Sequence, residues 1–422
     1  MLKTVHEAAF ALGVSADTIR RWEKKGLIKA SRSPQNYRLF DLAELQRVKE
    51  KYSGESAGRG FYVLQAPKNG LSVIELFSGA GGMALGFENA GFETRLLVEW
   101  EKDPVATLRQ NRPDWDVVHA DVAKVDFKRY HGDVDVVAGG FPCQAFSYAG
   151  NGRGFEDTRG TLFFEFARCI NEVRPKIALG ENVRGLLGHD SGRTLQTMLS
   201  VFRGLGYRVE FRLLRAQFFD VPQKRERLII IGIREDIDAP HLFPKERDYT
   251  LSLREALENC PESAGARYPE RKREILELIP PGGYWKDLPT DLQKEYMGGS
   301  FHLAGGKTGM ARRLDWDEPS LTLTCSPAQK QTERCHPSET RPLSVREYAR
   351  LQTFPDDWAF AGSVASQYKQ IGNAVPVNLG YHVGRALQTM LTGEGDLADF
   401  ESSIVPEPEL KQDSEKGVYL LS

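Results

Sequence analysis

The fold of this chain is decided by the stretch Val73-Ile-Glu-Leu-Phe-Ser-Gly-Ala-Gly-Gly82, in which an apolar run passes directly into a glycine-rich turn. The apolar run predicts a buried strand, and the residues after Gly82 predict a helix. Glycines at such a junction let the backbone come close to a ligand at the amino end of the helix. The stretch therefore predicts a strand–loop–helix unit of an α/β fold that binds a ligand at its loop.

Further apolar runs alternate with helical stretches on both sides of this unit. They predict strands at residues 72–77, 95–99, 117–120, 134–138, 177–180, 207–214 and 228–233. Strands that alternate with helices favour a doubly wound α/β sheet with mostly parallel strands. The periodicity dissolves between about residues 235 and 340 and returns before a helix predicted at 378–391. An irregular second domain is therefore predicted to be inserted into the α/β domain.

These patterns divide the chain into six segments. We predict an N-terminal module, a linker, the first part of the α/β domain, the inserted domain, the second part of the α/β domain and a loosely ordered polar tail. Their boundaries are 1–52, 53–70, 71–234, 235–340, 341–392 and 393–422.

The N-terminal module has the pattern of a winged helix–turn–helix. A helix over 5–12 and a second over 16–25 are separated by a turn at Gly13, and the second is capped by Ser15. Asn36-Tyr-Arg-Leu-Phe40 is typical of a wing, and Asp41 is predicted to cap a third helix that runs through Val48. The pattern resembles MerR-like domains, for which the other interpretation is a helical hairpin that contacts proteins. We predict that Arg20, Arg21 and Arg38 contact DNA.

Composition sets limits on the kind of protein. With 41% hydrophobic and 27% charged residues among 422, and no secretory signal or apolar run long enough to cross a membrane, we expect a soluble cytoplasmic protein. A formal net charge of -2 predicts no global attraction to nucleic acid, so DNA binding must come from local basic clusters. The five cysteines lack a CxxC pair, and the nearest thing to a ligand cluster is Cys325 with Cys335 and His336. We predict no metal site.

The residues after the second and third strands indicate adenosine. Glu99 follows the glycine loop by about twenty residues, where a carboxylate can bond ribose hydroxyls. Trp100 offers an aromatic face to a purine, and Asp121 can accept from the adenine amino group. The loop alone suits dinucleotide enzymes equally well, but the phosphate fingerprint is missing. An adenosine cofactor without pyrophosphate, such as S-adenosyl-L-methionine, fits these residues.

A cysteine stands at a position typical of a nucleophile. Gly140-Phe-Pro-Cys-Gln144 directly follows the buried run 134–139, so Cys143 lies where a strand of an open α/β sheet meets its ligand crevice. A thiolate there is a strong nucleophile. Taken alone, a free cysteine is more often a small buried hydrophobic residue.

Five motifs occur in order and resemble a known family. They are Phe77–Gly82, Gly140–Ser147, Glu181–Val183, Gln223–Arg227 and Gly372–Pro376. Together they resemble the DNA cytosine-5 methyltransferases of bacterial restriction-modification systems, over about residues 71–391. The inserted segment then corresponds to the family's target recognition domain. One departure is Gly180, where a bulkier strand residue is expected.

The resemblance implies roles for four catalytic residues. Carbon 5 of cytosine is a poor nucleophile, so the Cys143 thiolate would add to carbon 6 and turn the ring into an enamine. Glu181, protonated or sharing a proton, would contact ring nitrogen 3 and the exocyclic amino group. Arg227 would bond the carbonyl oxygen, and Arg225 would support the site near a phosphate. An Arg-x-Arg pair without the other motifs would indicate only a solvated face.

The resemblance also implies the cofactor and DNA contacts. S-adenosyl-L-methionine would be bound by Phe77, Gly79, Gly81, Glu99, Trp100, Asp121, Val122, Pro142, Asn373 and Val375. The target cytosine would rotate out of the duplex, and the glycine-rich loop after Cys143 would close over it. The expected DNA contacts are Ser147, Arg153 and Arg159, with Arg312, Arg313, Lys330 and Arg334 facing the other side of the duplex.

The resulting prediction is a sequence-specific enzyme that methylates double-stranded DNA as a monomer. A cognate restriction endonuclease would be its functional partner, and the N-terminal module would repress the enzyme's own promoter. The alternatives are an RNA cytosine-5 methyltransferase and a transcriptional regulator with an inactive methyltransferase body. A nicotinamide-dependent oxidoreductase would leave the Pro-Cys and Glu-Asn-Val motifs unexplained.

Overall fold

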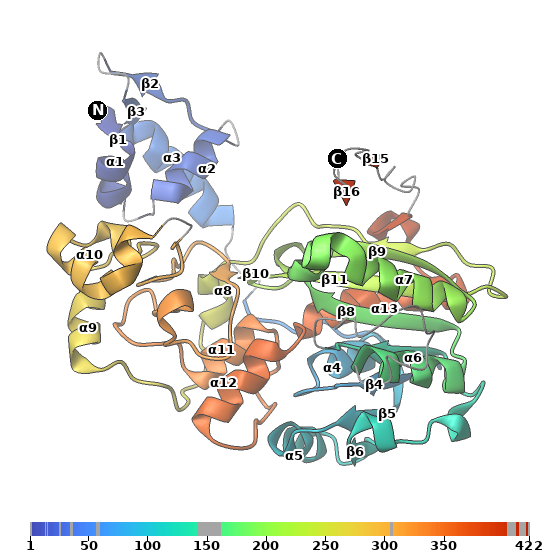
Figure 1. Cartoon of the computed structure of the whole chain (residues 1–422). Helices are drawn as coiled ribbons and strands as arrows, with labels where there is room; N and C mark the ends of the chain where they lie inside the picture. The colour runs from blue at the N-terminus through green and yellow to red at the C-terminus, as the bar shows by residue number, and fades with distance from the viewer. Residues whose placement is uncertain are drawn as a thin grey trace.

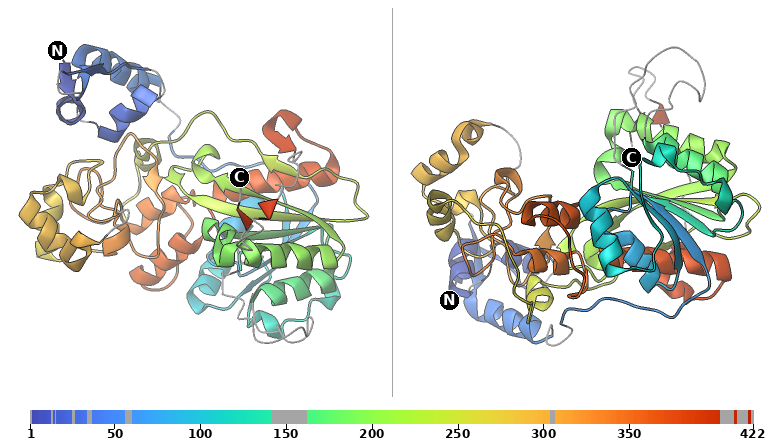
Figure 2. Two further views of the ribbon diagram at one scale, coloured as in Figure 1. Left: turned by 45° about the horizontal axis from the view of Figure 1, so that its top comes forward. Right: turned by 90° about the horizontal axis from the view of Figure 1, so that it is seen from below.

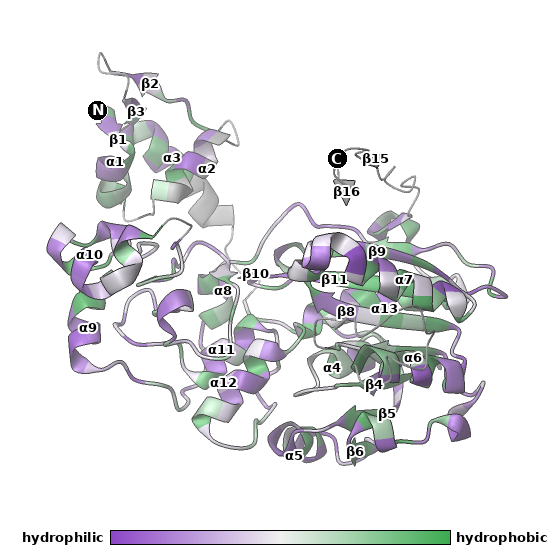
Figure 3. Cartoon of the chain, viewed as in Figure 1, coloured by the Kyte–Doolittle hydropathy of each residue, from purple (hydrophilic) through white to green (hydrophobic). Residues whose placement is uncertain are grey.

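The computed structural model describes residues 2–12, 14, 16–24, 27–33, 37–55, 60–141, 162–303, 307–402, 411–412 and 419–420. Figure 1 shows a small N-terminal part, a layered α/β body and an irregular part beside that body. The two views of Figure 2 show the same separation. In Figure 3 the hydrophobic residues gather on central strands such as β4 (Ser72–Leu76), all of whose residues are buried.

The N-terminal part has the predicted helices and wing. Its elements are β1 (Leu2–Thr4), α1 (Val5–Leu12), α2 (Ala16–Lys24), β2 (Ser31–Arg32), β3 (Arg38–Asp41) and α3 (Leu42–Glu55), with the strands in the antiparallel order β1-β3-β2. Trp22 is buried beside Ile19 and Phe40 in a small core. The Asp41 carboxylate accepts a hydrogen bond from the backbone N–H of Ala43 at 2.8 Å, as predicted for a cap. Helix α3 continues past the predicted end at Val48.

A seven-stranded sheet forms the body, in the order β6-β5-β4-β7-β8-β11-β9. Besides β4, its strands are β5 (Glu93–Glu99), β6 (Val117–His119), β7 (Val136–Gly139), β8 (Ile177–Val183), β9 (Tyr207–Arg215) and β11 (Glu226–Arg234). Strand β11 is antiparallel to both neighbours, and the pairs among β4 to β8 are parallel. The doubly wound, mostly parallel sheet is confirmed, and each of the seven predicted strands is present.

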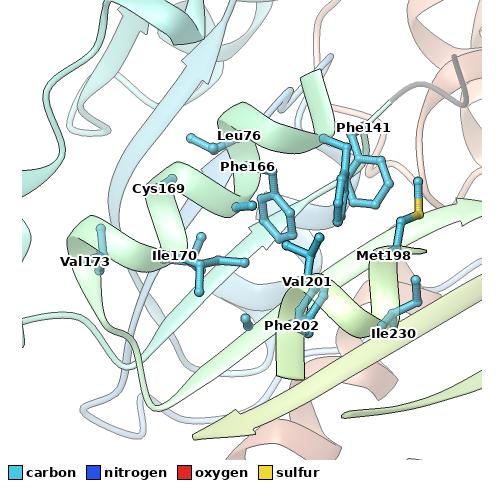
Figure 4. Close-up of a cluster of buried hydrophobic side chains, with 14 of the residues drawn as sticks. Leu76, Phe141, Phe166, Cys169, Ile170, Val173, Met198, Val201, Phe202 and Ile230 are labelled. Atoms are coloured by element: carbon cyan, nitrogen blue, oxygen red, sulfur yellow. The ribbon is translucent and has the colours of Figure 1, made fainter. Parts of the chain in front are cut away.

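Helices cover both faces of the sheet. On one face α6 (Leu162–Val173) and α7 (Arg193–Gly204) bury a cluster that includes Phe166 and Phe202 (Figure 4). On the other face α4 (Gly82–Asn89) and α13 (Val377–Thr392) pack against alternate strand residues. A Cβ atom at Gly86 would lie 2.7 Å from the Cα of Gly380, so glycine permits this close helix contact. Helix α5 (Lys102–Asn111) lies between β5 and β6 in sequence.

The irregular part has short elements and a core of its own. It contains α8 (Leu253–Leu257), α9 (Glu270–Glu277), α10 (Thr290–Met297) and β13 (Ser320–Leu321), whereas β12 (Leu242–Pro244) packs on the body against α13. Its core gathers Leu276, Trp285 and Met297. The chain then returns to the body through α11 (Val345–Leu351) and α12 (Val364–Asn373). The short β10 (Gln223–Lys224) pairs in parallel with β13.

Short 3-10 helices occur between these elements, at Val122–Lys124, Lys128–Tyr130, Arg184–Leu187, His189–Gly192, Ala216–Phe218, Trp285–Asp287, Gly298–His302, Lys330–Thr332 and Leu397–Asp399.

Two segments are more ordered than the sequence predicts. In the tail, β14 (Phe400–Ser402) pairs antiparallel with β12, because Phe400 packs on the apolar cluster under α13. Further on, β15 (Lys411–Gln412) pairs with β16 (Tyr419–Leu420). In the predicted linker, Leu64 donates its backbone N–H to Asn378 of α13 at 3.0 Å. The tail is therefore ordered over these strands, unlike the loose tail that the sequence predicts, and the linker contacts the body at Leu64.

Candidate active site at the carboxyl edge of the sheet

The strand order reverses between β4 and β7. From β4 the chain continues to β5 and β6 on one side, and from β7 it continues to β8 on the other. Leu76 at the end of β4 lies opposite Gly139 at the end of β7. Open α/β sheets bind ligands in the crevice outside the carboxyl ends of the strands at such a switch point. The candidate site is therefore the crevice above these two strands.

The loop after β4 has a backbone that only glycine adopts without strain. Gly79 and Gly81 have φ values of 52° and 84°, and Phe77 itself has a φ of 60°. The N–H of Phe77 donates to Val98 O at 2.9 Å, which ties the start of the loop to the neighbouring strand. A Cβ at Gly81 would also lie 2.6 Å from the Leu108 side chain. The sequence therefore needs glycine here for both conformation and space.

Glu99 fixes the geometry of this edge. Its carboxylate accepts from the N–H groups of Gly79 at 2.7 Å, Trp100 at 2.8 Å and Glu101 at 2.7 Å. The Trp100 side chain, by contrast, is 67% exposed. Asp121 accepts from Ala123 N–H at 3.0 Å and precedes the buried Val122. Glu99 and Trp100 thus lie at the end of β5 and Asp121 follows the neighbouring strand β6, with an open aromatic face at the end of β5.

Glu75 is a site residue that sequence reasoning missed. Its carboxyl group is buried inside β4, and its Oε2 has no hydrogen-bond partner within the described ranges of the chain. Burial raises the pKa of Glu75 well above its usual range, and the nearby Glu181 and Glu99 raise the pKa further. The signal in the sequence was a single acidic residue in an apolar strand. Burial of such a residue is energetically unfavourable, so its presence indicates a functional role.

Glu181 and Arg227 meet across two antiparallel strands. Glu181 lies on β8 opposite Ile229, and Arg227 lies on β11 opposite Val183. Arg227 Nε lies 2.6 Å from Glu181 Oε1, as an ion pair rather than an aligned hydrogen bond. Both side chains are nearly buried, so the charges face each other with little water between them.

The Glu181 carboxyl also borders the segment that leads to Cys143. A Cβ at Gly140 would lie 2.9 Å from Glu181 Oε2. Phe141 then turns into the core between α6 and the sheet, and Asn182 Nδ2 donates to its carbonyl at 2.9 Å. A Cβ at Gly180 would lie 3.3 Å from the Phe141 ring. The departure noted at Gly180 therefore makes room for Phe141.

Five predicted site residues lie outside the described residues: Pro142, Cys143, Ser147, Arg153 and Arg159. Their roles stay predictions. The described chain ends at Phe141 at the switch point, two residues before Cys143.

Arg225 lies inside the protein rather than at its surface. Its side chain is 1% exposed, with Nη1 donating to Leu323 O at 3.1 Å and Nη2 to Gly372 O at 2.9 Å. Burial lowers the pKa of Arg225, and Arg227 lowers it further. This location differs from the expected one beside a phosphate.

Asn373 and Val375 come to the glycine loop from the second part of the body. A Cβ at Gly82 would lie 2.1 Å from Val375 O, so the two loops are in direct backbone contact. Asn373 is exposed, and the Cys325 thiol donates to its Oδ1 at 3.1 Å. The structure thus brings both residues next to the loop that carries Gly79 and Gly81.

The predicted DNA contacts differ in how open they are. Arg20 is exposed, Arg38 is half exposed and pairs with Glu23 at 3.0 Å, and the Arg21 side chain is outside the described part. In the irregular part Arg313 and Arg334 are 4% and 5% exposed, so the expectation that they face DNA is wrong. Arg313 Nη1 donates to His336 O at 3.1 Å and Arg334 Nε to Thr322 O at 3.0 Å. Lys330 is exposed and Arg312 is partly buried.

None of the helices among the described residues is long and apolar enough to span a membrane. Over the same residues, no group of three or more His, Cys, Asp or Glu side chains is placed to hold a metal ion.

Comparisons with known proteins match both parts of the chain. Residues 71–389 match the family of C-5 cytosine-specific DNA methylases, and residues 4–40 match the MerR family of regulatory proteins. Type II methyltransferase M.Eco47II of Escherichia coli is 54% identical over 405 residues, covering 92% of this chain and 95% of that protein. Type II methyltransferase M.PspPI of Psychrobacter sp. (strain TA137) is 51% identical over 394 residues, covering 91% and 95%.

Solved structures agree with this fold. A DNA modification methyltransferase encoded within a prophage of Escherichia coli superposes with a TM-score of 0.57 at 25% identity, covering 76% of this chain and 99% of that one. The DNMT2 protein of Spodoptera frugiperda superposes with a TM-score of 0.55 at 15% identity, covering 75% and 99%, which shows a shared fold.

Proposed function

The chain belongs to the C-5 cytosine-specific DNA methylase family, and on that premise we propose that it methylates cytosine in duplex DNA through a covalent adduct on Cys143. It is a DNA cytosine-5 methyltransferase of the Type II kind. The observation that carries the proposal is the Glu181–Arg227 pair beside Gly140, because it puts an acid and a cation at the strand end that leads to Cys143.

S-adenosyl-L-methionine is the proposed cofactor, and the charges at the switch point support it. Glu75, Glu99 and Glu181 gather there, so a pyrophosphate would be repelled and a cationic ligand attracted. Glu99 would hold the ribose, Trp100 would cover the adenine, and Asp121 would accept from the adenine amino group. Glu75 is available to an ammonium group because its Oε2 lacks a partner in the described part of the chain. When bound, the cofactor supplies an electrophilic methyl group.

The proposed reaction begins with addition of the Cys143 thiolate to carbon 6 of the cytosine. The sulfur–carbon bond forms, the 5,6 double bond breaks, and its electron pair makes carbon 5 nucleophilic. Glu181 in its protonated form gives a proton to ring nitrogen 3, and Arg227, no longer paired with a carboxylate, bonds the carbonyl oxygen, so the charge that enters the ring is neutralised.

Carbon 5 then takes the methyl group and carries both a methyl and a hydrogen. A base removes that hydrogen as a proton, the 5,6 double bond re-forms, and the sulfur–carbon bond breaks to free the thiolate. Nitrogen 3 returns its proton to Glu181, so the side chains end as they began.

The target base must leave the duplex for this chemistry. A stacked cytosine offers neither of its faces to a side chain, and extrusion costs a few kcal/mol. We propose that residues 235–340 select the target and that Ser147, Arg153 and Arg159 hold the strand around the extruded base. Among the basic residues of the irregular part, exposed Lys330 is the better candidate for a DNA contact than buried Arg313 or Arg334.

The Cys143→Ser variant tests the mechanism. A hydroxyl is a much weaker nucleophile than a thiolate at neutral pH, so methyl transfer to duplex DNA should fall to background while S-adenosylhomocysteine binding changes little. Tritiated methyl transfer and calorimetric titration measure the two quantities. Turnover near the wild-type value would contradict the covalent mechanism.

We propose that methylation protects DNA from cleavage by a partner restriction endonuclease. We also propose a separate role for the N-terminal module, residues 1–52. The body already contains a recognition region, so the module is free to bind and repress the enzyme's own promoter. Deleting residues 2–55, which removes α3 whole, should leave the methylated sequence unchanged and raise expression from that promoter. Bisulfite sequencing that finds different methylated cytosines would contradict this division.

A further inference from the structure

A buried hydrogen-bonded network of Gln223, Gln352 and Arg225 joins the irregular part to the loop 372–376 that packs on the cofactor edge. All three side chains are at most 1% exposed. We propose that this network couples target recognition to cofactor affinity, so that its members are positioning residues for the methyl transfer. The inference rests on the proposed function, because it assumes that S-adenosyl-L-methionine and duplex DNA occupy the two sides.

The first link holds the end of the irregular part. Leu323, just after β13, donates its N–H to Gln223 Oε1 at 2.9 Å, and its carbonyl accepts from Arg225 Nη1 at 3.1 Å. Both backbone groups of Leu323 are thus held by side chains from the Gln223–Arg227 motif. The residue before Leu323 is tied to the rest of the irregular part, since Thr322 O accepts from Arg334 Nε at 3.0 Å. A shift in the irregular part must therefore move or break the contacts of Leu323.

The second link holds the loop on the cofactor side. Gln223 Nε2 donates to Gln352 Oε1 at 2.9 Å, and Gln352 Nε2 donates to Ile371 O at 2.7 Å and to Ala374 O at 3.1 Å. Arg225 Nη2 donates to Gly372 O at 2.9 Å. The same network that holds Leu323 thus fixes the carbonyls on both sides of Asn373.

The third link reaches the glycine loop by direct contact. A Cβ at Gly372 would lie 2.2 Å from Thr324 O, so the two held segments touch backbone to backbone. Beyond Asn373, Val375 O presses on Gly82 at the start of α4. Packed backbones with no free space cannot shift independently. Movement at Leu323 is therefore passed to Asn373 and to the loop of Gly79 and Gly81.

Breaking the buried hydrogen bonds of the network is energetically unfavourable, which makes the network suitable for coupling the irregular part to the loop 372–376. Each buried carbonyl left without its donor destabilises the folded protein, and the loss is greater for a charged donor such as Arg225. Arg225 is held by carbonyl oxygens, and its Nε has no hydrogen-bond partner within the described residues. A charge solvated by peptide carbonyls responds to small movements of those carbonyls, because the stabilisation depends on their direction.

Coupling of this kind is measurable as a ratio of affinities. Calorimetry would give the dissociation constant of S-adenosylhomocysteine with and without a duplex that the wild-type enzyme methylates. Binding is reciprocal, so target DNA that tightens cofactor binding is itself bound more tightly with cofactor. For the wild type we expect target DNA to tighten S-adenosylhomocysteine binding at least about fivefold, and an unrelated duplex to have little effect.

The variants separate coupling from stability. Gln352→Met removes the donors to Ile371 and Ala374 with little change in volume. Gln370→Met is the matched control, because Gln370 is equally buried on α12 but bonds Thr107 and Ala361 instead. Both should lower the unfolding temperature. Only Gln352→Met should reduce the affinity ratio to below about twofold, while Gln370→Met keeps the wild-type ratio.

Gln223→Met provides a second variant, because it removes the acceptor of the Leu323 N–H and the donors to Leu351 O and Gln352 Oε1, and leaves the Gln352 donors to Ile371 and Ala374 in place. It should reduce the affinity ratio for S-adenosylhomocysteine to below about twofold, as Gln352→Met does. The inference would be overturned if a folded Gln352→Met or Gln223→Met protein kept the affinity ratio of the wild type. It would also be overturned if target DNA did not change the affinity of the wild-type protein for S-adenosylhomocysteine. Methyl transfer by the wild type on the same duplex is scored separately, so a failure of the proposed function is recognised by itself.

Discussion

The cofactor edge of the sheet and the irregular part use polar residues in opposite ways. At the edge, strands and helices satisfy the backbone, and side chains such as Trp100 and Glu75 are left for a ligand. In the irregular part backbone groups pair through scattered single hydrogen bonds rather than long ladders, and buried arginines supply further donors. Arg313 donates to the carbonyls of His336 and Leu276, and Arg334 to that of Thr322.

The same difference appears in the buried ion pairs. In the irregular part Glu333 is fully buried and is held by Lys272 and the Tyr296 hydroxyl. Burial raises the pKa of Glu333, while Lys272 opposes that effect. At the edge, Glu75 has no such cation in the described part of the chain, and its nearby charges are carboxyls. Charge is paired within the fold in one region, and in the other a carboxyl group is left unpaired where we propose that the cofactor binds.

The strongest test of the edge is Glu181→Gln. The amide can still contact the base but cannot give a proton to nitrogen 3, so turnover should fall by about 10²–10³ while DNA affinity changes little. Single-turnover kinetics and DNA titration measure the two effects. Equal losses in both would make Glu181 a structural residue, like the buried charges of the irregular part.

For the irregular part the matching test is Arg313→Met. It leaves the carbonyls of His336 and Leu276 without donors, so the protein should lose about 2–4 kcal/mol of unfolding free energy. At a temperature where the variant is folded, its DNA affinity should stay near wild type, whereas Lys330→Ala should weaken DNA binding without loss of stability. The reverse result would place Arg313 at the DNA.

Glu75→Gln should stabilise the protein and weaken its cofactor binding. The folded-state pKa of Glu75 is raised, so its contribution to stability falls as pH rises above the unfolded-state pKa of about 4.3. The amide removes that penalty. The gain in unfolding temperature should therefore be greater at about pH 8 than at about pH 5. Thermal scans across pH and calorimetry with S-adenosylhomocysteine measure both, and a loss of stability at high pH would contradict the assignment.

The smallest effect is expected for Trp100→Ala. The ring is largely exposed, so its loss should not change the unfolding temperature, but stacking on a base is worth about 1–3 kcal/mol. S-adenosylhomocysteine should therefore bind about tenfold more weakly. Leu278→Ala, another exposed apolar residue but in the irregular part, is the control. If Trp100→Ala and Leu278→Ala bound S-adenosylhomocysteine with equal affinity, Trp100 would not be part of the cofactor site.

The sequence predicted what strand periodicity and glycine can specify. The central strands were predictable because burial on both faces demands apolar runs, and the loop at Gly79 and Gly81 because positive φ demands glycine. Strand ends then predicted that Glu99, Trp100 and Asp121 follow neighbouring strands.

Contacts between distant segments could not be predicted. No local pattern indicates that Gly180 makes room for Phe141, that Arg225 holds Leu323 and Gly372, or that Phe400 fixes the tail on α13. In the sequence, Arg313 and Arg334 cannot be distinguished from arginines that bind DNA. Only the tertiary fold shows that backbone carbonyls accept their hydrogen bonds.

The central claim is tested most directly by a duplex that carries 5-fluorocytosine at the methylated position. The fluorine cannot leave as a proton does, so the reaction should stop after methyl transfer with the DNA still bonded to the enzyme. After denaturation, mass spectrometry should find the modified base on the peptide that contains Cys143, and the Cys143→Ser protein should give no adduct. A wild-type enzyme that methylates ordinary duplex but forms no adduct, or an adduct on a different residue, would contradict the account.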